Sequence, residues 1–495
     1  MVMIQQLYPL FVAIPLGVAF LVLLFPKSLT RVVEGIVAIS NIILLIMAVD
    51  LIGHAPFSYF VGKWAPPLGI TLVSDSISTL LLLVITIVGL LSLLFAFQYM
   101  EMYTSKIRFY ALFMLMAAGM NGVVITGDMF NLFVFLEIAT IASYALVGFG
   151  CESEELEASF KYMILGCVSS TFVLLGVAIL YSTFGTLNMA DLANSISVKG
   201  INKSVLFAEA LFIMGFGLKA AMVPFHAWLP DAHPSAPAPI SAMLSGVLIK
   251  ACGIYAIIRV SYHVIGMTPL IHIILMSLGL LSMVVGVLLA VGQWDFKRLL
   301  AYHSISQMGY VMVGIGLGTP LGILGGLFHL MNHAFFKSLL FLCSGAIEYS
   351  TGTRNLKEMG GLFKRMPVTS SSCSIASLSI SGIPPFNGFW SKLIIIIALV
   401  QAEYYAIAAI TVCVSFLTLV SFIKVQRYSI FGDLPEKFKG LKEIPVLMGS
   451  ALVILAILCL GAGVLYPFFG EVVFEIARDT IMDQQKYIQL VLQLM

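Results

Sequence analysis

The chain contains 495 residues, of which 60% are hydrophobic and only 10% are charged, whereas soluble proteins carry a charge on about 25% of their residues. The net charge of +2 excludes nothing by itself, but the sequence has no basic tract suited to nucleic acid. Apolar runs long enough to cross a bilayer recur from one end to the other, so we predict an all-α polytopic membrane protein.

The first apolar run is expected to be a membrane span and not a cleavable signal peptide. No basic segment precedes it, and it leads through Pro26, Lys27 and Arg31 directly into a second apolar run. The seven cysteines form no CxxC pair and lie mostly within apolar runs, so neither a disulfide framework nor an iron–sulfur site is predicted.

About fourteen spans can be placed along the chain by length and hydropathy. They cover residues 4–25, 31–52, 73–98, 109–127, 129–149, 159–183, 204–222, 237–258, 270–291, 299–318, 321–348, 367–401, 403–423 and 446–469. The segment from His54 to Gly69 is rich in proline, glycine and aromatic residues, and we predict an ordered interfacial loop or hairpin there. Two amphipathic segments, from Thr186 to Ile196 and from Glu471 to Leu494, are predicted to lie along the membrane surface.

The distribution of positive charge predicts the orientation, because cytoplasmic loops carry an excess of lysine and arginine. The odd-numbered loops carry sixteen of the 26 such residues: Lys27, Arg31, Lys106, Arg108, Lys161, Lys297, Arg298, Arg354, Lys357, Lys364, Arg365, Lys424, Arg427, Lys437, Lys439 and Lys442. The even-numbered loops carry Lys63, Lys199, Lys203 and Arg259, and the tail adds Arg478 and Lys486. We therefore expect both termini to lie outside the cell.

Four lysines remain, and all four lie within predicted spans: Lys219, Lys250, Lys337 and Lys392. An intramembrane lysine is unfavourable by about 2.5–3.5 kcal/mol even on insertion scales, so each one needs a partner, water or a function.

The seventh and twelfth spans are predicted to be broken helices. Pro224 begins the sequence PFHAW shortly after Lys219, and Pro385 begins PFNGF shortly before Lys392. Two broken spans at corresponding places in two halves are typical of transporters built from inverted repeats, although the lysine precedes one break and follows the other.

Glu137 lies about eight residues, or about 12 Å, into the fifth span, and it is the only acid that we place deep within a span. Two interpretations are open. Glu137 is either part of a structural ion pair or a neutral hydrogen-bonded carboxyl, or it is the partner that controls the charge on Lys219. In the second case, separation of the pair would release a proton and closure would capture one.

Lys250 lies about thirteen residues into the eighth span, where its side chain is too short to reach the roughly 20 Å to the nearest helix end. We therefore favour a proton carrier near the membrane midplane, with Ser241 and Ser245 supporting a water chain. His329, His333 and Lys337 are spaced by four residues and share one helix face.

The two histidines on that face are either packed core residues or titrating carriers. A metal site is disfavoured because no further ligand is apparent and a lysine follows four residues later. Lys392, on the twelfth span, would close the series. Weaker candidates are His226, Asp231 and His233 in the linker after Pro224, where they would admit protons, and Glu209, Asp75, His303, Ser304 and Gln307.

Four motifs resemble the antiporter-like, proton-conducting membrane subunits. They are FLEIATIASYALVGF, GFGLKAAMVPFHAWLPDAHPSAPAPISAMLSG, KRLLAYHSISQMGY and HLMNHAFFKSLLF. The family includes the large subunits of Mrp-type Na⁺/H⁺ antiporters, among them the D-type, the antiporter-like subunits of membrane-bound hydrogenases, and the L, M and N subunits of complex I.

The resemblance implies fourteen helices with outward termini, and two inverted five-helix repeats formed by helices 4–8 and 9–13. The implied division is 1–108 for helices 1–3, 109–262 and 263–428 for the repeats, and 429–495 for helix 14 and the tail. It also implies a proton relay through Glu137, Lys219, Lys250, His329, His333, Lys337 and Lys392, each of which matches a family position.

We expect a proton-translocating subunit of a multisubunit complex in the cell membrane, either a cation/proton antiporter or a hydrogenase- or complex I-like respiratory complex. Other membrane subunits would be its partners, joined by a hydrogenase or dehydrogenase arm in the redox-driven case. No cofactor and no bond chemistry are expected in this chain, so any translocase activity would belong to the complex. Two alternatives remain, a non-conducting structural anchor for a redox arm and direct Na⁺ transport. The four lysines argue against the anchor, and a single deep acid offers Na⁺ a poor site.

Overall fold

The computed structural model describes residues 2–103 and 105–493, and this part of the chain is almost entirely helical. Eleven of its helical segments are long and apolar enough to cross a membrane: Gln5–Val22, Lys27–Leu51, Ser76–Met102, Lys106–Ile125, Met129–Val147, Ser153–Phe184, Ala238–Ile265, Pro269–Val291, Pro320–Thr351, Tyr405–Ile430 and Val446–Phe468. An all-α polytopic membrane fold is therefore confirmed.

Three further predicted spans are helical but short, polar or interrupted. They correspond to α9 (Lys203–Lys219), α14 (Phe296–Gly316) and the pair α16 (Pro367–Ser381) and α17 (Asn387–Gln401). The count of fourteen spans stays a prediction.

The first third of the chain forms α1 (Val2–Leu7), α2 (Leu10–Val22), α3 (Thr30–Leu51), α4 (Ser76–Tyr99), α5 (Lys106–Ile125), α6 (Met129–Val147) and α7 (Ser153–Phe184). Between α3 and α4, strands β1 (Phe57–Phe60) and β2 (Thr71–Ser74) pair in antiparallel fashion. This confirms the predicted hairpin, whose second strand begins just beyond Gly69. Asp75 then caps α4, because its side chain accepts the backbone N–H of Ser78.

The middle of the chain contains α8 (Met189–Lys199), α9, α10 (Leu229–Ser235) and α11 (Ala238–Met243). The eighth span continues from α11 through η4 (Leu244–Leu248), η5 (Lys250–Tyr255), α12 (Ala256–Ile258) and η6 (Arg259–Ile265), of which the three η segments are π-helical. The predicted end at residue 258 is thus wrong, and so is the placement of Arg259 in a loop. Its side chain is buried inside the helix bundle.

The remainder comprises α13 (Pro269–Val291), α14, α15 (Pro320–Thr351), α16, α17, α18 (Tyr405–Val425) and α19 (Val446–Leu465). Short one-turn segments η1 (Lys27–Leu29), η2 (Val61–Lys63), η3 (Met100–Met102), η7 (Leu356–Glu358), η8 (Leu362–Lys364), η9 (Gln426–Ile430), η10 (Glu436–Phe438) and η11 (Tyr466–Gly470) connect or extend these helices.

The tail forms α20 (Glu471–Met482) and α21 (Gln484–Leu492), and α20 packs on α15 and α4 while α21 packs on α8. Leu494, at the end of the predicted amphipathic tail, lies outside the described residues.

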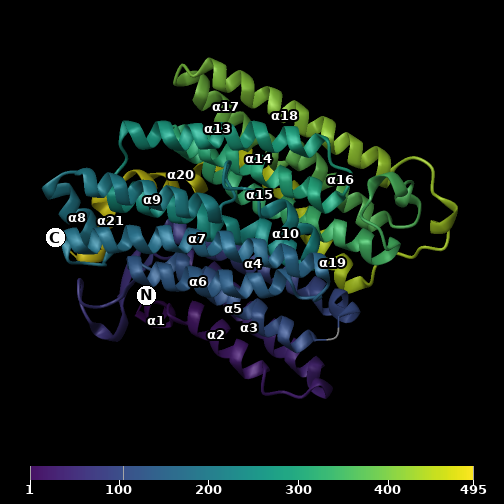
Figure 1. Ribbon diagram of the computed structural model, residues 1–495, viewed down its shortest axis with the longest axis horizontal. Coiled ribbons are helices and arrows are strands. Elements are labelled where there is room, and N and C mark those ends of the chain that lie inside the picture. Colours follow the sequence, from purple (N-terminus) through teal and green to yellow (C-terminus); the bar gives the residue numbers. More distant parts are fainter. Residues whose placement is uncertain (1, 104, 494–495) are drawn as a thin grey trace.

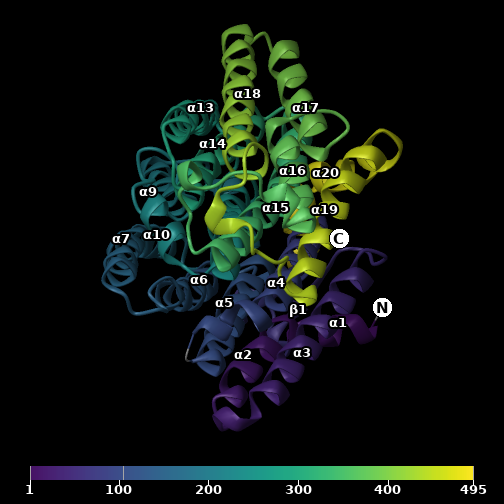
Figure 2. The ribbon, with the colours of Figure 1, turned by 90° about the vertical axis from the view of Figure 1, so that its right-hand side faces the viewer.

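Most helices run side by side along the long axis of the molecule (Figure 1). Viewed from the end, α2 and α3 lie on one side of the bundle and α17 and α18 on the other (Figure 2). Both chain ends lie toward the same end of the bundle, together with α8 and α21, while the segment that joins α18 to α19 lies at the opposite end (Figure 1).

Side chains satisfy the backbone where the seventh span is interrupted. Pro224 has no N–H and cannot continue α9, so polar backbone groups would be left inside the bundle. The indole Nε1 of Trp228 donates to the carbonyl of Leu218 (3.0 Å), and the backbone N–H of Val223 donates to Ser282 Oγ (2.9 Å). These two hydrogen bonds therefore stabilise the interruption, and the C-terminal end of α9 can remain buried.

Candidate functional site

Lys219 is the last residue of α9, and it lies opposite Glu137 of α6. Its Nζ is 3.7 Å from Glu137 Oε1 and donates to the hydroxyls of Thr140 (3.3 Å), Tyr144 (3.2 Å) and Ser170 (3.3 Å). Ser170 in turn donates to Glu137 Oε1, so one hydroxyl touches both charged groups. The sequence-based pairing of Glu137 with Lys219 thus holds in the structure.

Exposure differs across this pair, because Lys219 is 1% exposed whereas the Glu137 side chain is 25% exposed. An aromatic stack closes the inner side, since Trp228 stacks on Tyr162 with ring centroids 4.1 Å apart. The Tyr162 ring meets that of Tyr144 edge-on at 4.5 Å. The lysine is therefore enclosed, whereas part of the Glu137 side chain reaches the surface of the chain.

Lys250 lies at the start of the π-helical segment η5 and is fully buried. Its Nζ donates to the carbonyl of Ser245 at 2.6 Å, and the hydroxyl of Ser245 bonds to that of Ser304 at 2.7 Å. No carboxylate in the described part of the chain forms an ion pair with Lys250. π-Helical turns of this kind are frequent at functional sites.

His329, His333 and Lys337 are buried on α15, as their spacing predicts. His329 bonds through Nδ1 to Ser391 Oγ (2.9 Å) and through Nε2 to Gln307 Oε1 (3.1 Å). Both ring nitrogens of His333 and the Nζ of Lys337 make no hydrogen bond to any described residue. His333 interacts electrostatically with Lys250, Lys337 and His329, so these four side chains form a central row.

Lys392, on α17, is buried beyond this row. Its Nζ donates to the carbonyl of Ile380 (2.7 Å) and to Ser415 Oγ (3.2 Å), and it lies 4.9 Å from the ring centroid of Tyr310. Lys392 interacts electrostatically with His329. The structure therefore groups the candidates into the Glu137–Lys219 pair, the central row and Lys392.

Two residues that the sequence indicated only as weaker candidates also lie with these groups. His233 is fully buried on α10, packs on the Phe341 ring at 4.5 Å, and interacts electrostatically with Lys337 and Lys250. His303 bonds to Ser421 Oγ at 2.8 Å and interacts with both Lys337 and Lys392. The sequence around His233 is typical of a loop and did not predict its burial. That burial depends on the packing of α10 against α14.

The remaining weaker candidates have other partners. Asp231 forms ion pairs at the surface with Lys161 and Arg298, both at 3.1 Å, and His226 is only partly buried. Glu209 is buried against Ser261. Glu209 is therefore a second buried acid on a predicted span, at 2% exposed, although it lies nearer to a helix end than Glu137 does.

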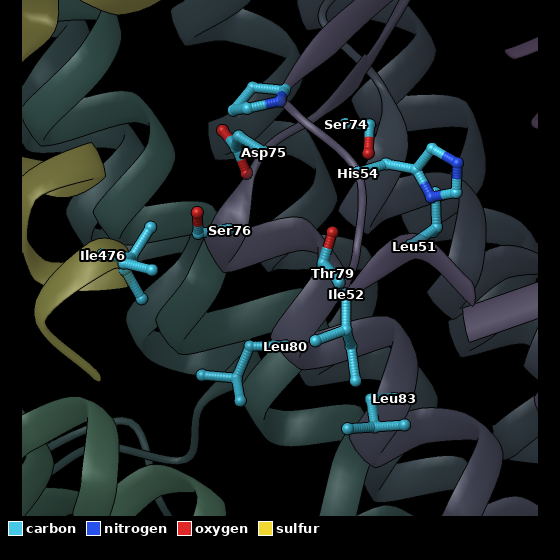
Figure 3. Close-up of a pocket in the computed structure, with 12 residues that line it drawn as sticks. Leu51, Ile52, His54, Ser74, Asp75, Ser76, Thr79, Leu80, Leu83 and Ile476 are labelled. Atoms are coloured by element: carbon cyan, nitrogen blue, oxygen red, sulfur yellow. The ribbon is translucent and has the colours of Figure 1, made fainter. Parts of the chain in front are cut away.

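Asp75 and Arg259 form a second buried ion pair at 2.7 Å, at the end of the bundle that holds the termini. Arg259 also donates to Tyr255 OH (2.7 Å) and lies 2.8 Å from His263 Nδ1, while His263 Nε2 bonds to the carbonyl of Thr480 in α20 (2.7 Å). A cavity of about 450 Å³ lies beside Asp75, with Asp75, Ser74 and His54 toward one end and Leu80 and Leu83 toward the other (Figure 3). This ion pair links the hairpin, the eighth span and the tail, and it stands apart from the central row.

Metal ligation finds no support in the part of the chain that the structure describes, because no three His, Cys, Asp or Glu side chains gather there as a metal site requires.

Residues 126–418, more than half of the chain, match the family described as "NADH:quinone oxidoreductase/Mrp antiporter, TM". Residues 65–110 match "NADH-Ubiquinone oxidoreductase (complex I), chain 5 N-terminus".

Individual relatives match over nearly their whole length. The D-type subunit of the Na⁺/H⁺ antiporter of Alkalihalophilus pseudofirmus is 37% identical over 491 residues, which cover 97% of this chain and 98% of the relative. A chain of the Mrp complex from Dietzia sp. DQ12-45-1b aligns with a TM-score of 0.90 at 31% identity, covering 99% of both chains. A chain of the membrane-bound sulfane sulfur reductase, an archaeal respiratory membrane complex, aligns with a TM-score of 0.91 at 34% identity, covering 98% of this chain and 100% of that one.

Proposed function

The chain belongs to the NADH:quinone oxidoreductase/Mrp antiporter family, and we propose that it carries protons across the cell membrane as one subunit of a multisubunit complex. Its partners are other membrane subunits, as in the Mrp complex and the respiratory complex whose chains it resembles. The inverted repeats 109–262 and 263–428 form the conducting part, with 1–108 and 429–495 flanking them.

The observation that carries this proposal is the burial of the four lysines that lie within predicted spans, Lys219, Lys250, Lys337 and Lys392. Each is 3% exposed or less, and of these four only Lys219 has a carboxylate partner among the described residues. Unpaired buried ammonium groups destabilise a protein, and a passive anchor would gain nothing from them. Groups that exchange protons with one another must be buried, close together and able to lose their charge.

Protons enter from the lysine-rich end, which we place in the cytoplasm. A cavity of about 380 Å³ opens there, and its wall includes Lys297 and Glu348. Lys297 forms an ion pair with Glu348 at 2.9 Å and donates to the carbonyl of Ala236. Since Lys297 is itself buried and interacts electrostatically with His233, this histidine follows Lys297 on the inward route.

Charge repulsion moves the proton along the central row. Lys250 and Lys337 interact electrostatically, as do both of them with His333. Two positive charges at short range in a low-dielectric interior repel strongly, so a proton that arrives on Lys250 displaces one from Lys337 or His333. His329 and Lys392 then pass it to the other side.

The Glu137–Lys219 pair sets the timing of this transfer. When Glu137 lies against Lys219 the ammonium is stabilised, and when it moves away that stabilisation is lost. Because the Glu137 side chain is partly exposed on α6, an adjoining subunit can displace it, which couples the pair to the driving reaction of the complex.

Replacement of Lys219 tests the proposal. Lys219→Ala in the assembled complex should lower proton transport at least about tenfold, measured with a pH-sensitive dye in inverted membrane vesicles. Lys203→Ala is the matched control, since Lys203 is exposed at the start of the same helix. Native gel electrophoresis checks assembly of the complex, and undiminished transport by assembled Lys219→Ala would overturn the proposal.

A further inference from the structure

Glu209 is a buried carboxyl group for which the route described above has no use. It lies on α9 and is 2% exposed. Its Oε1 accepts a hydrogen bond from Ser261 Oγ at 2.5 Å, and its Oε2 makes no hydrogen bond to any described residue. The acid therefore has a single neutral partner.

No cation neutralises this carboxyl group among the described residues. The elements packed on α9 include α7, η5, α12 and η6, and the charged side chains that flank Ser261 on η6 are Arg259 and His263. Arg259 binds Asp75, and His263 binds the carbonyl of Thr480. Because an unpaired carboxylate is strongly disfavoured in a buried site, burial favours the protonated form of Glu209.

Glu209 contrasts in this respect with Glu137 and Asp75. Glu137 faces Lys219 at 3.7 Å, and Asp75 binds Arg259 at 2.7 Å. Both of these acids have a cation that stabilises their charged form. Glu209 is thus the member of this set that is poised to give up a proton.

Glu209 and Lys219 lie on the same helix, α9. Ten residues separate them on one helix, which corresponds to about 15 Å at 1.5 Å per residue. Lys219 ends the helix inside the bundle, while α9 begins beside α8, at the end that holds both termini (Figure 1). Glu209 therefore lies between Lys219 and that end of the molecule.

We propose that Glu209, hydrogen-bonded to Ser261, is a proton-exchange site that links Lys219 to the outer side of the membrane. The inference rests on the proposed function, which supplies the direction of transport. The protonated carboxyl releases H⁺ to outer water and is reprotonated from the lysine side, so one proton passes outward and no other bond changes. A metal cation is not the cargo here, because hard cations take about six or more oxygen ligands and this site offers one carboxyl and one hydroxyl.

Carbodiimide labelling tests this assignment in the intact complex. Dicyclohexylcarbodiimide enters apolar sites and reacts with protonated carboxyl groups, and the modified residue can be identified by mass spectrometry of peptides. We expect the adduct on Glu209, with little on Asp75 or Glu137, and a loss of proton transport that parallels the labelling. Labelling of Glu137 or Asp75 with Glu209 unmodified would overturn the proposal.

Variants give an independent measurement. Glu209→Gln should abolish the adduct and lower proton transport about tenfold or more, whereas Glu209→Asp should keep the adduct and part of the transport. Glu403→Gln is the control, since Glu403 is an exposed carboxylate. If Glu209→Gln does not assemble, labelling of the wild type and Glu209→Asp decide the question.

The outcomes separate the two proposals. Wild-type transport by Glu209→Gln, together with its loss in Lys219→Ala, would overturn the outer exchange site and leave the proposed function standing. Wild-type transport by both variants would overturn both.

Discussion

Lys219 is held by hydroxyl groups as well as by a carboxylate, and these hydroxyls can keep the ammonium hydrogen-bonded when its ion pair opens. The oxygens of Thr140, Tyr144 and Ser170 lie 3.2–3.3 Å from its Nζ. Glu137 is farther away, at 3.7 Å. A movement of Glu137 removes the counter-charge and leaves these hydrogen bonds in place, so the ammonium keeps its partners while its proton becomes easier to release.

A double substitution separates the structural contribution of this pair from its contribution to transport. Glu137→Gln leaves a buried ammonium without its counter-charge, and we expect it to lower the free energy of unfolding by about 1–3 kcal/mol and to lower proton transport. Adding Lys219→Gln removes the uncompensated charge, so stability should recover while transport should not. Thermal unfolding of the purified complex and dye-based transport assays measure the two effects, and a double variant that transports protons would contradict the switch.

The surroundings of some of these residues could be predicted from the sequence and those of others could not, for physical reasons. A lysine and a glutamate within apolar runs have few ways to be satisfied, so the Glu137–Lys219 contact could be predicted. Arg259 and Glu209 lie near expected helix ends, where a charge is usually solvated. Their burial depends on the extension of the eighth span to Ile265 and on packing by the tail, which no local pattern encodes.

At the scale of elements, the two interrupted helices bring Lys219 and Lys392 to equivalent places. Lys219 is the last residue of α9, whereas Lys392 lies several residues inside α17. The Nζ of Lys392, however, reaches back to the carbonyl of Ile380, in the last turn of α16. Both ammonium groups therefore lie at the C-terminal end of the first half of a broken helix, where the helix dipole favours a cation. In sequence the two breaks look unlike, because the lysine precedes one and follows the other. In the structure the long lysine side chain compensates for this difference in position.

Replacement of Lys392 by an apolar residue of similar length tests whether this lysine carries protons or supports the fold. In Lys392→Met the carbonyl of Ile380 loses a donor, but a buried ammonium without a carboxylate partner is also removed, so thermal stability should equal or exceed that of the wild type. Proton transport should fall, and Lys424→Met, which removes a partly exposed lysine on α18, should leave it largely unchanged. If Lys250→Met combined with Lys392→Met pumped normally, the structural-anchor alternative would be favoured.

At the scale of the whole molecule, the two ends of the bundle differ in construction. One end holds both termini and is tied together by the tail, since the carbonyl of Thr480 accepts from His263 and the carbonyl of Leu490 accepts from Ser58. The other end carries most of the lysines and arginines and the cavity beside Lys297. Hydropathy and charge alone predicted the division into two ends. The packing of the tail against α15 and α4 depends on tertiary contacts that a surface-helix pattern does not reveal.

Thiol labelling from the two sides of the membrane tests the orientation that this division predicts. Cys151 is exposed in the segment between α6 and α7, on the lysine-rich side. A membrane-impermeant maleimide should therefore label it in inverted vesicles and not in intact cells. Val198→Cys, at an exposed position of α8 near the termini, should show the opposite pattern, and Cys151→Ser should remove the first signal. Labelling of Cys151 from outside the cell would reverse the orientation, and Glu209 would then be an entry site for protons from the cytoplasm.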